Sequence, residues 1–138
     1  MLVDTPGFLP GASQEQAGVI RHGASLLRAF SVATTPRITV TLRAAYGGAH
    51  IVMNSRDLGA DLTMAWPHAK IGVMGPRQAV EIVNRREIAA GADAQALSDA
   101  YAAEHLPVRV AASRGFIDEV VAPSETRERI AFALEAAR

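Results

Sequence analysis

The chain has 138 residues, with 14 basic and 14 acidic side chains and no cysteine. This length allows one domain with a real core, and the even charge balance disfavours a nucleic-acid-binding platform, which is usually basic. The lack of cysteine excludes disulfides, zinc ribbons, iron–sulfur ligation and thiol catalysis. Because no apolar run reaches the ~18 residues of a membrane span, we expect a soluble, cytoplasmic protein without a membrane partner.

The first residues have the pattern of a buried strand that is about to end. Met1–Val3 is apolar, Asp4 ends the run, and Thr-Pro-Gly at residues 5–7 begins a loop. A domain rarely begins with the last part of a central strand. We therefore expect the domain to be truncated at its N-terminal side, before Leu2.

Helical and strand patterns alternate along the first half of the chain. Ser13 and Gln16 form a possible capping box for a helix over 14–33, in which Gly18 and Gly23 indicate close packing. Short strands are predicted over 37–42, 61–66 and 70–73. Between the first two, residues 46–49 form a tight turn, and a second helix opens near His50.

The second half is mainly helical. The pattern predicts a helix over 76–90, a helix over 93–105 capped by Asp93, and a short helix or irregular segment over 107–113. Residues 115–121 turn into a last short strand, and an amphipathic helix runs from 123 to 138 with Ile130, Ala133, Leu134 and Ala137 on one face. Helices that alternate with short strands predict an α/β fold.

Most motifs that could carry side-chain chemistry are weak or missing. Asp4 and the following Thr-Pro-Gly match the DxxG element of GTPases, but the chain has neither a GxxxxGKS/T loop nor an Asn-Lys-x-Asp motif. The histidines, at positions 22, 50, 68 and 105, lack the spacing of a metal site, so we predict no metal. No GxSxG nucleophile is present, and Asp118 and Glu119 are expected to be a solvated strand end.

Backbone amides are therefore the most plausible source of any chemistry. At Tyr46–Ala49 a strand ends, two glycines let the backbone turn sharply, and a helix begins. Free amides and the helix dipole at such a junction resemble an oxyanion hole, although a plain tight turn explains the same residues equally well. A β-branched residue at Gly48 is expected to distort this turn, and His50 stands at a position suited to function.

Seven segments, in order through nearly the whole chain, carry a resemblance to a known family. They are Val3–Gly11, Gln14 and Glu15, Ile20–Ala24, Ala45–Ala49, Ala65–Ile71, Val73–Gly75, and Ala111–Gly115 with Asp118. Together they resemble the C-terminal half of the carboxyltransferase (β) subunit of biotin-dependent acyl-CoA carboxylases of the acetyl-/propionyl-CoA type.

This resemblance implies a crotonase-like (ClpP/crotonase) spiral of ββα units, with residues 1–138 forming a single C-terminal carboxyltransferase domain that lacks its first ββα unit. It implies carboxyl transfer from carboxybiotin, on a partner carrier domain, to a short acyl-CoA. Carried over to this chain, Tyr46–Ala49 would bind biotin, and the amides of Gly48 and Ala49 would form the biotin-side oxyanion hole. His50 and Ile51 would line the acyl pocket.

The family also implies partners. These are the N-terminal carboxyltransferase domain of another subunit, which supplies the thioester-side oxyanion hole, a biotin carboxyl carrier or biotin carboxylase subunit, and further copies in a homo-oligomer. The chain departs from the family pattern at Pro76–Gln78, at Leu106 before Pro107, and at His50, where tyrosine is common. Alternatives are a non-catalytic assembly module or truncated paralogue, and a related decarboxylase or transcarboxylase. A half-site alone is expected to be inactive.

Overall fold

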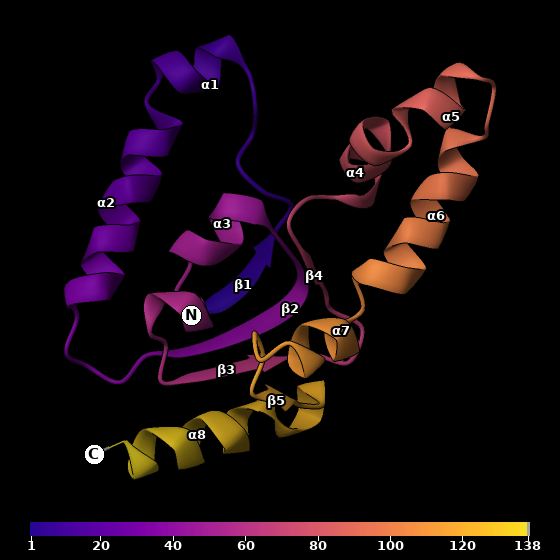
Figure 1. Cartoon of the computed structure of the whole chain (residues 1–138). Helices are drawn as coiled ribbons and strands as arrows, with labels where there is room; N and C mark the ends of the chain where they lie inside the picture. The colour runs from indigo at the N-terminus through magenta and orange to yellow at the C-terminus, as the bar shows by residue number, and fades with distance from the viewer. Residues whose placement is uncertain (138) are drawn as a thin grey trace.

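Five parallel strands form one sheet in the computed structural model, which describes residues 1–137 (Figure 1). The strand order is β1-β2-β3-β5, and β4 pairs with the last part of β2. Because β3 pairs with the first half of β2 and β4 with its end, the two short strands follow one another along β2. The strands are β1 (Leu2–Thr5), β2 (Ile38–Tyr46), β3 (Leu62–Ala65), β4 (Lys70–Gly72) and β5 (Glu119–Val120).

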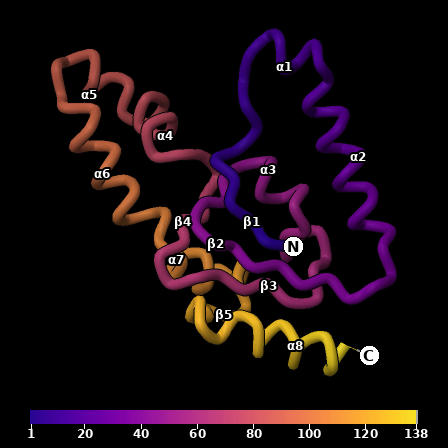
Figure 2. The backbone as a smooth tube through the Cα atoms, turned by 180° about the vertical axis from the view of Figure 1, so that it is seen from behind, coloured from indigo at the N-terminus to yellow at the C-terminus, as the bar shows by residue number. Residues whose placement is uncertain are grey.

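Two groups of helices extend from the sheet on opposite sides, and α8 lies along a third side of it (Figures 1 and 2). One group holds α1 (Ala12–Gln16), α2 (Val19–Val32) and α3 (Gly47–Val52), followed by the 3-10 turn η1 (Arg56–Leu58). A second group projects as an arm and holds α4 (Pro76–Val83), α5 (Arg85–Ala89) and α6 (Ala94–His105), and α7 (Val108–Ser113) lies at its base. The chain ends with η2 (Pro123–Glu125) and α8 (Thr126–Ala136).

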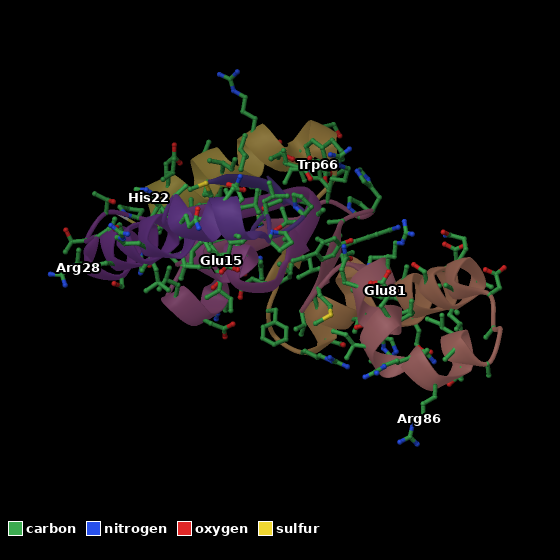
Figure 3. The ribbon with its side chains drawn as sticks, turned by 90° about the horizontal axis from the view of Figure 1, so that it is seen from above. Glu15, His22, Arg28, Trp66, Glu81 and Arg86 are labelled. Atoms are coloured by element: carbon green, nitrogen blue, oxygen red, sulfur yellow. The ribbon has the colours of Figure 1, made fainter. Side chains whose placement is uncertain are left out.

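Alternation along β2 supplies two apolar faces. Ile38 and Val40 pack with Met64 and Val121, and α8 covers this face through Ile130 and Ala133. On the other face, Ala45 packs with Ile71, Val3 and residues of α7. A strand buried on both faces explains why the segment reads as nearly continuous apolar and β-branched residues. Trp66 joins β3 to α8, because its Nε1 donates to Thr126 Oγ1 at 3.0 Å (Figure 3).

The predicted α/β class is confirmed, but two long helices are broken. The helix expected over 14–33 is α1 and α2, because Gly18 adopts φ 80°, a left-handed conformation that a continuous helix does not contain. The predicted capping box is wrong, since α1 begins after Gly11 and has no side-chain cap. The helix expected over 76–90 divides at Asn84 into α4 and α5.

Other helix predictions agree better with the structure. Gly23 is buried, and a Cβ there would lie 2.7 Å from the ring of Phe8, which confirms the predicted close packing. Asp93 caps α6 by accepting from the amides of Gln95 and Ala96. The final helix begins with the 3-10 turn η2, and Leu134 of its predicted apolar face is exposed.

Asp118 and Glu119 lie at a strand end as predicted, with Asp118 exposed and Glu119 half-buried, but both carboxylates are also paired. Asp118 Oδ2 accepts from the amide and the hydroxyl of Thr63 at 2.8 and 2.7 Å, and Arg56 lies 2.6 Å from Asp118 Oδ1. Glu119 pairs with Arg129 of α8 at 2.7 Å. These contacts come from segments far away in sequence and fasten the last strand to β3, η1 and α8, which is why the local pattern did not reveal them.

Candidate functional site

An open groove of about 590 Å³ lies at the carboxyl ends of β2 and β4. Tyr46 of β2 and Gly72 of β4 are register partners, so the chain leaves both strands at the same edge of the sheet. Ligands in open α/β sheets commonly bind at such an edge. The groove is lined by residues of α3, η1, β4 and the arm: Gly47, Gly48, His50, Ile51, Asp57, Ile71, Gly72, Val73, Val83, Tyr101, His105, Leu106, Val110, Ala111, Arg114 and Phe116.

The diglycine turn is tighter than predicted, because β2 passes into α3 without an intervening loop. Gly47 adopts φ 60°, and a Cβ at this position would lie 2.9 Å from the carbonyl oxygen of Val73. A Cβ on Gly48 would meet only the ring of Phe8, at an ordinary 3.5 Å. The stricter requirement for glycine is therefore at Gly47 rather than at Gly48, the position singled out from the sequence.

The amides of Gly48 and Ala49 lie in the first turn of α3, where no preceding turn offers a carbonyl. Within residues 1–137, neither amide donates a hydrogen bond to a loop, a neighbouring strand or a side chain. Positive partial charge gathers at such a helix start. The structure thus places two unpaired donors at the start of α3, and of these two residues Gly48 lines the groove whereas Ala49 does not.

The remaining predicted residues divide between the groove and the core. Gly47, Gly48, His50 and Ile51 line the groove. Tyr46 and Ala49 are buried and do not line it. Burial raises the pKa of the Tyr46 phenol, which is the usual result of removing a phenolate from water. A direct contact from these two residues to a ligand in the groove would have to come from the backbone.

His50 is a half-buried titratable group that lines the groove. Its Nδ1 is shielded from solvent and has no hydrogen-bond partner among the described residues 1–137. Burial lowers the pKa of His50 below the ordinary 6.5, and the nearby Asp57 carboxylate offsets part of this effect. The neutral imidazole is therefore favoured in the folded chain.

This shift predicts a pH-dependent stability. The unfolded chain takes up a proton near pH 6.5, whereas folded His50 resists protonation until a lower pH. The contribution of His50 to the free energy of unfolding is thus fully present above pH 6.5 and is lost as the pH falls through the lowered pKa. Urea unfolding of the wild type and of His50→Phe between pH 8 and 5 should show a smaller acid loss in the variant. Parallel curves for the two proteins would contradict the shift.

The residues of the opposite wall of the groove were not predicted from the sequence. Tyr101 and His105 of α6 face each other with ring centroids 4.6 Å apart. Arg114 and Phe116, which come just after the end of α7, also line this wall. These residues lie more than fifty positions after the diglycine turn. A detectable signal existed in the spacing of Tyr101 and His105, which places both rings on one side of a helix.

The described residues contain neither a metal-binding cluster nor a helix that could span a membrane. Among positions 1–137, no three His, Asp or Glu side chains form a group that could hold a metal ion. None of the helices in this part of the chain combines the length and the apolar character needed to cross a membrane.

The parallel sheet, whose strand ends open on an apolar groove beside a glycine turn and a helix start, makes this an α/β protein, and its match to a solved carboxyltransferase structure gives the crotonase-like class. The sequence model of the family described as "Carboxyl transferase domain" matches residues 1–138, so the chain belongs to this family. The family predicted from the seven sequence segments is thereby confirmed.

Individual relatives agree. The chain is 51% identical over 138 residues to the methylmalonyl-CoA carboxyltransferase 12S subunit of Propionibacterium freudenreichii subsp. shermanii, covering 97% of this chain and 26% of that protein. It is 52% identical over 132 residues to the propionyl-CoA carboxylase carboxyltransferase subunit of Haloferax mediterranei, covering 93% of this chain and 26% of that protein.

Solved structures show the same fold. A transcarboxylase 12S crystal structure, described as a hexamer with methylmalonyl-CoA and methylmalonic acid bound, matches with a TM-score of 0.90 and 49% identity. That match covers 99% of this chain and 26% of the other chain. The β subunit of geranyl-CoA carboxylase from P. aeruginosa shares the fold at 24% identity, with a TM-score of 0.85 over 97% of this chain and 27% of that chain. The chain thus spans about a quarter of the length of these proteins.

Proposed function

We propose that this chain takes part in carboxyl transfer between carboxybiotin and a short acyl-CoA, and that it supplies the oxyanion hole on the biotin side. The observation that carries the proposal is the pair of unpaired amides, at Gly48 and Ala49, beside a groove in a member of the carboxyl transferase family. Relatives are named for methylmalonyl-CoA and propionyl-CoA, and one from Mycobacterium leprae is named as biotin-dependent.

The groove fits a ligand of this chemistry. Its volume of about 590 Å³ is in the range of pockets for small organic ligands, and most of its lining is apolar. Biotin combines apolar carbon atoms with one polar ureido group, which suits an apolar wall with a few converging donors. When bound, biotin supplies the carrier of the carboxyl group.

The chain's own residues would position the ligand and stabilise negative charge on its oxygen. Amides that are already aimed at an oxygen stabilise negative charge without reorganising, and the loss of one such donor typically costs ~10²–10³ in rate. Gly47 sets the direction of these amides through its left-handed backbone. Because the amides, rather than side chains, carry this role, the absence of a side-chain nucleophile from the sequence is consistent with the proposal.

In this proposal the chain provides one half of the carboxyltransferase site. We infer that residues 1–138 form the C-terminal carboxyltransferase domain and that the thioester-side oxyanion hole comes from the N-terminal carboxyltransferase domain of another subunit. A biotin carboxyl carrier or biotin carboxylase subunit would be a further partner, within a homo-oligomer. Large apolar side chains that remain exposed at the groove support a covering partner, among them Ile51, Val73, Val83 and Phe116.

The test is a reconstitution. The purified chain, supplied with carboxybiotin and propionyl-CoA, should give no carboxylated product, and adding the N-terminal carboxyltransferase domain of a relative should restore transfer. Light scattering at micromolar concentration should show a dimer or larger assembly. Transfer by the chain alone would contradict the half-site. No transfer in the reconstituted mixture would instead favour a non-catalytic assembly module.

Ile51 provides a prediction on substrate choice. It lines the groove with 42% of its side chain exposed, where it can contact an acyl chain. An apolar branched residue favours a short apolar acyl group, and one methylene changes binding by ~1–3 kcal/mol. Ile51→Asp should therefore change the ratio of kcat/KM values for acetyl-CoA and propionyl-CoA, with Ile20→Asp, exposed on α2, as the control. An unchanged ratio would show that Ile51 does not line the acyl pocket.

A further inference from the structure

His50 has two ring nitrogens in different surroundings. Nδ1 is shielded from solvent and makes no hydrogen bond within the part of the chain that the structure describes. Nε2 is not shielded in this way and makes no hydrogen bond within residues 1–137, and His50 is one of the residues that line the groove. Only Nε2 is therefore available to a ligand.

These surroundings select a tautomer. A proton on Nδ1 would bury an N–H donor without an acceptor, and such orphaned donors are rare and costly. A proton on Nε2 leaves Nδ1 as an unpaired acceptor and lets the N–H point toward water or a ligand. The arrangement with the proton on Nε2 is thus favoured, and the lowered pKa of His50 keeps the ring neutral.

We propose that His50 donates a hydrogen bond, through Nε2–H, to a carbonyl oxygen of the ligand bound in the groove. This inference rests on the proposed function and adds a side-chain donor one residue after the amides of Gly48 and Ala49. No proton is transferred, since the imidazole remains neutral and acts only as a donor. The role gives the groove a preference for ligands that present a carbonyl oxygen at this point over ligands that present only carbon.

Other charged and polar groups of the groove are placed differently. Asp57 lies in η1 and lines the groove. Its carboxylate can accept a hydrogen bond from the imidazole of His50 or repel an anionic ligand. Tyr101, His105 and Arg114 stand on the wall formed by α6 and α7. His50 is therefore the titratable side chain that α3 itself contributes next to the helix start.

Three variants distinguish a hydrogen-bond donor at His50 from a side chain that only fills space. In the reconstituted enzyme, His50→Phe removes the donor and should lower kcat/KM for carboxyl transfer to propionyl-CoA about tenfold. His50→Gln keeps an N–H near the position of Nε2 and should stay within about threefold of the wild type. His22→Phe, exposed on α2, is the matched control and should leave kcat/KM unchanged (Figure 3). Equal rates for the wild type and His50→Phe, or equal losses for the Phe and Gln variants, would overturn the inference.

A second measurement does not depend on turnover. Nitrogen-15 NMR of the chain with labelled histidine, assigned with His50→Phe, should show a protonated Nε2 and an unprotonated Nδ1 at pH 7.5. Free biotin or propionyl-CoA, added separately, should shift the Nε2–H signal of His50 and not that of His22. A proton on Nδ1, or no shift with either probe, would overturn the inference. If the reconstituted enzyme transfers no carboxyl group, the proposed function fails and this NMR result alone decides the role of His50.

Discussion

Gly47→Ala is expected to lower carboxyl transfer by ~10²–10³ in kcat in the reconstituted enzyme, the loss typical of a misaligned oxyanion hole. The added Cβ would lie 2.9 Å from the carbonyl oxygen of Val73, and φ 60° is strained for any residue with a side chain. The turn must move to relieve both effects, and the amides of Gly48 and Ala49 move with it. Single-turnover kinetics and the amide shifts of the two residues would measure the change.

Gly91→Ala is the matched control for this prediction. Gly91 also has a left-handed backbone, at φ 97°, but a Cβ there meets nothing within 4 Å, and the residue lies in the loop between α5 and α6. The control carries the same kind of backbone strain and should transfer the carboxyl group at the wild-type rate. If Gly47→Ala also kept the wild-type rate while folded, the turn would not set the geometry of the site.

Leu106→Ala is expected to lower the free energy of unfolding by about 2–5 kcal/mol. Leu106 is 0% exposed and sits where the arm returns to the sheet: its carbonyl accepts from the amide of Ile71 at 2.9 Å. Its side chain occupies the space left by Gly72, which has no Cβ. The truncation would leave a cavity between the arm and β4, next to the floor of the groove.

Urea unfolding followed by circular dichroism would measure this loss. Leu26→Ala, on α2, removes a leucine side chain that is 38% exposed and should cost far less, within about 1 kcal/mol. Similar losses for the two variants would mean that the base of the arm does not depend on Leu106. Leu106 is the position that departs from the family pattern, and the next residue, Pro107, makes a β-bridge to Lys70.

The diglycine turn shows which features of the site a local sequence pattern can predict and which it cannot. A β-branched run, two glycines and an apolar helical segment are adjacent in sequence, so strand, turn and helix start could be predicted together. The choice between Gly47 and Gly48 could not, because the carbonyl that crowds Gly47 belongs to Val73. The break at Gly18 had a visible signal in its glycine, and at Asn84 the backbone leaves the helical region with φ −101° and ψ 21°.

The α/β class and the glycine turn could be predicted from local patterns, and the family followed from seven short segments that resemble it. That resemblance also implied Ile51, which lines the groove together with His50. All of these depend on periodicity, backbone preference or segments that are contiguous in the chain. The tertiary structure alone decided that Tyr101, His105 and Arg114 form the second wall, that Asp118 is held by Thr63 and Arg56, and that Nδ1 of His50 has no partner. These features arise from contacts between residues far apart in the chain, and a single sequence carries no direct record of which distant groups meet or of which buried atom is left without a partner.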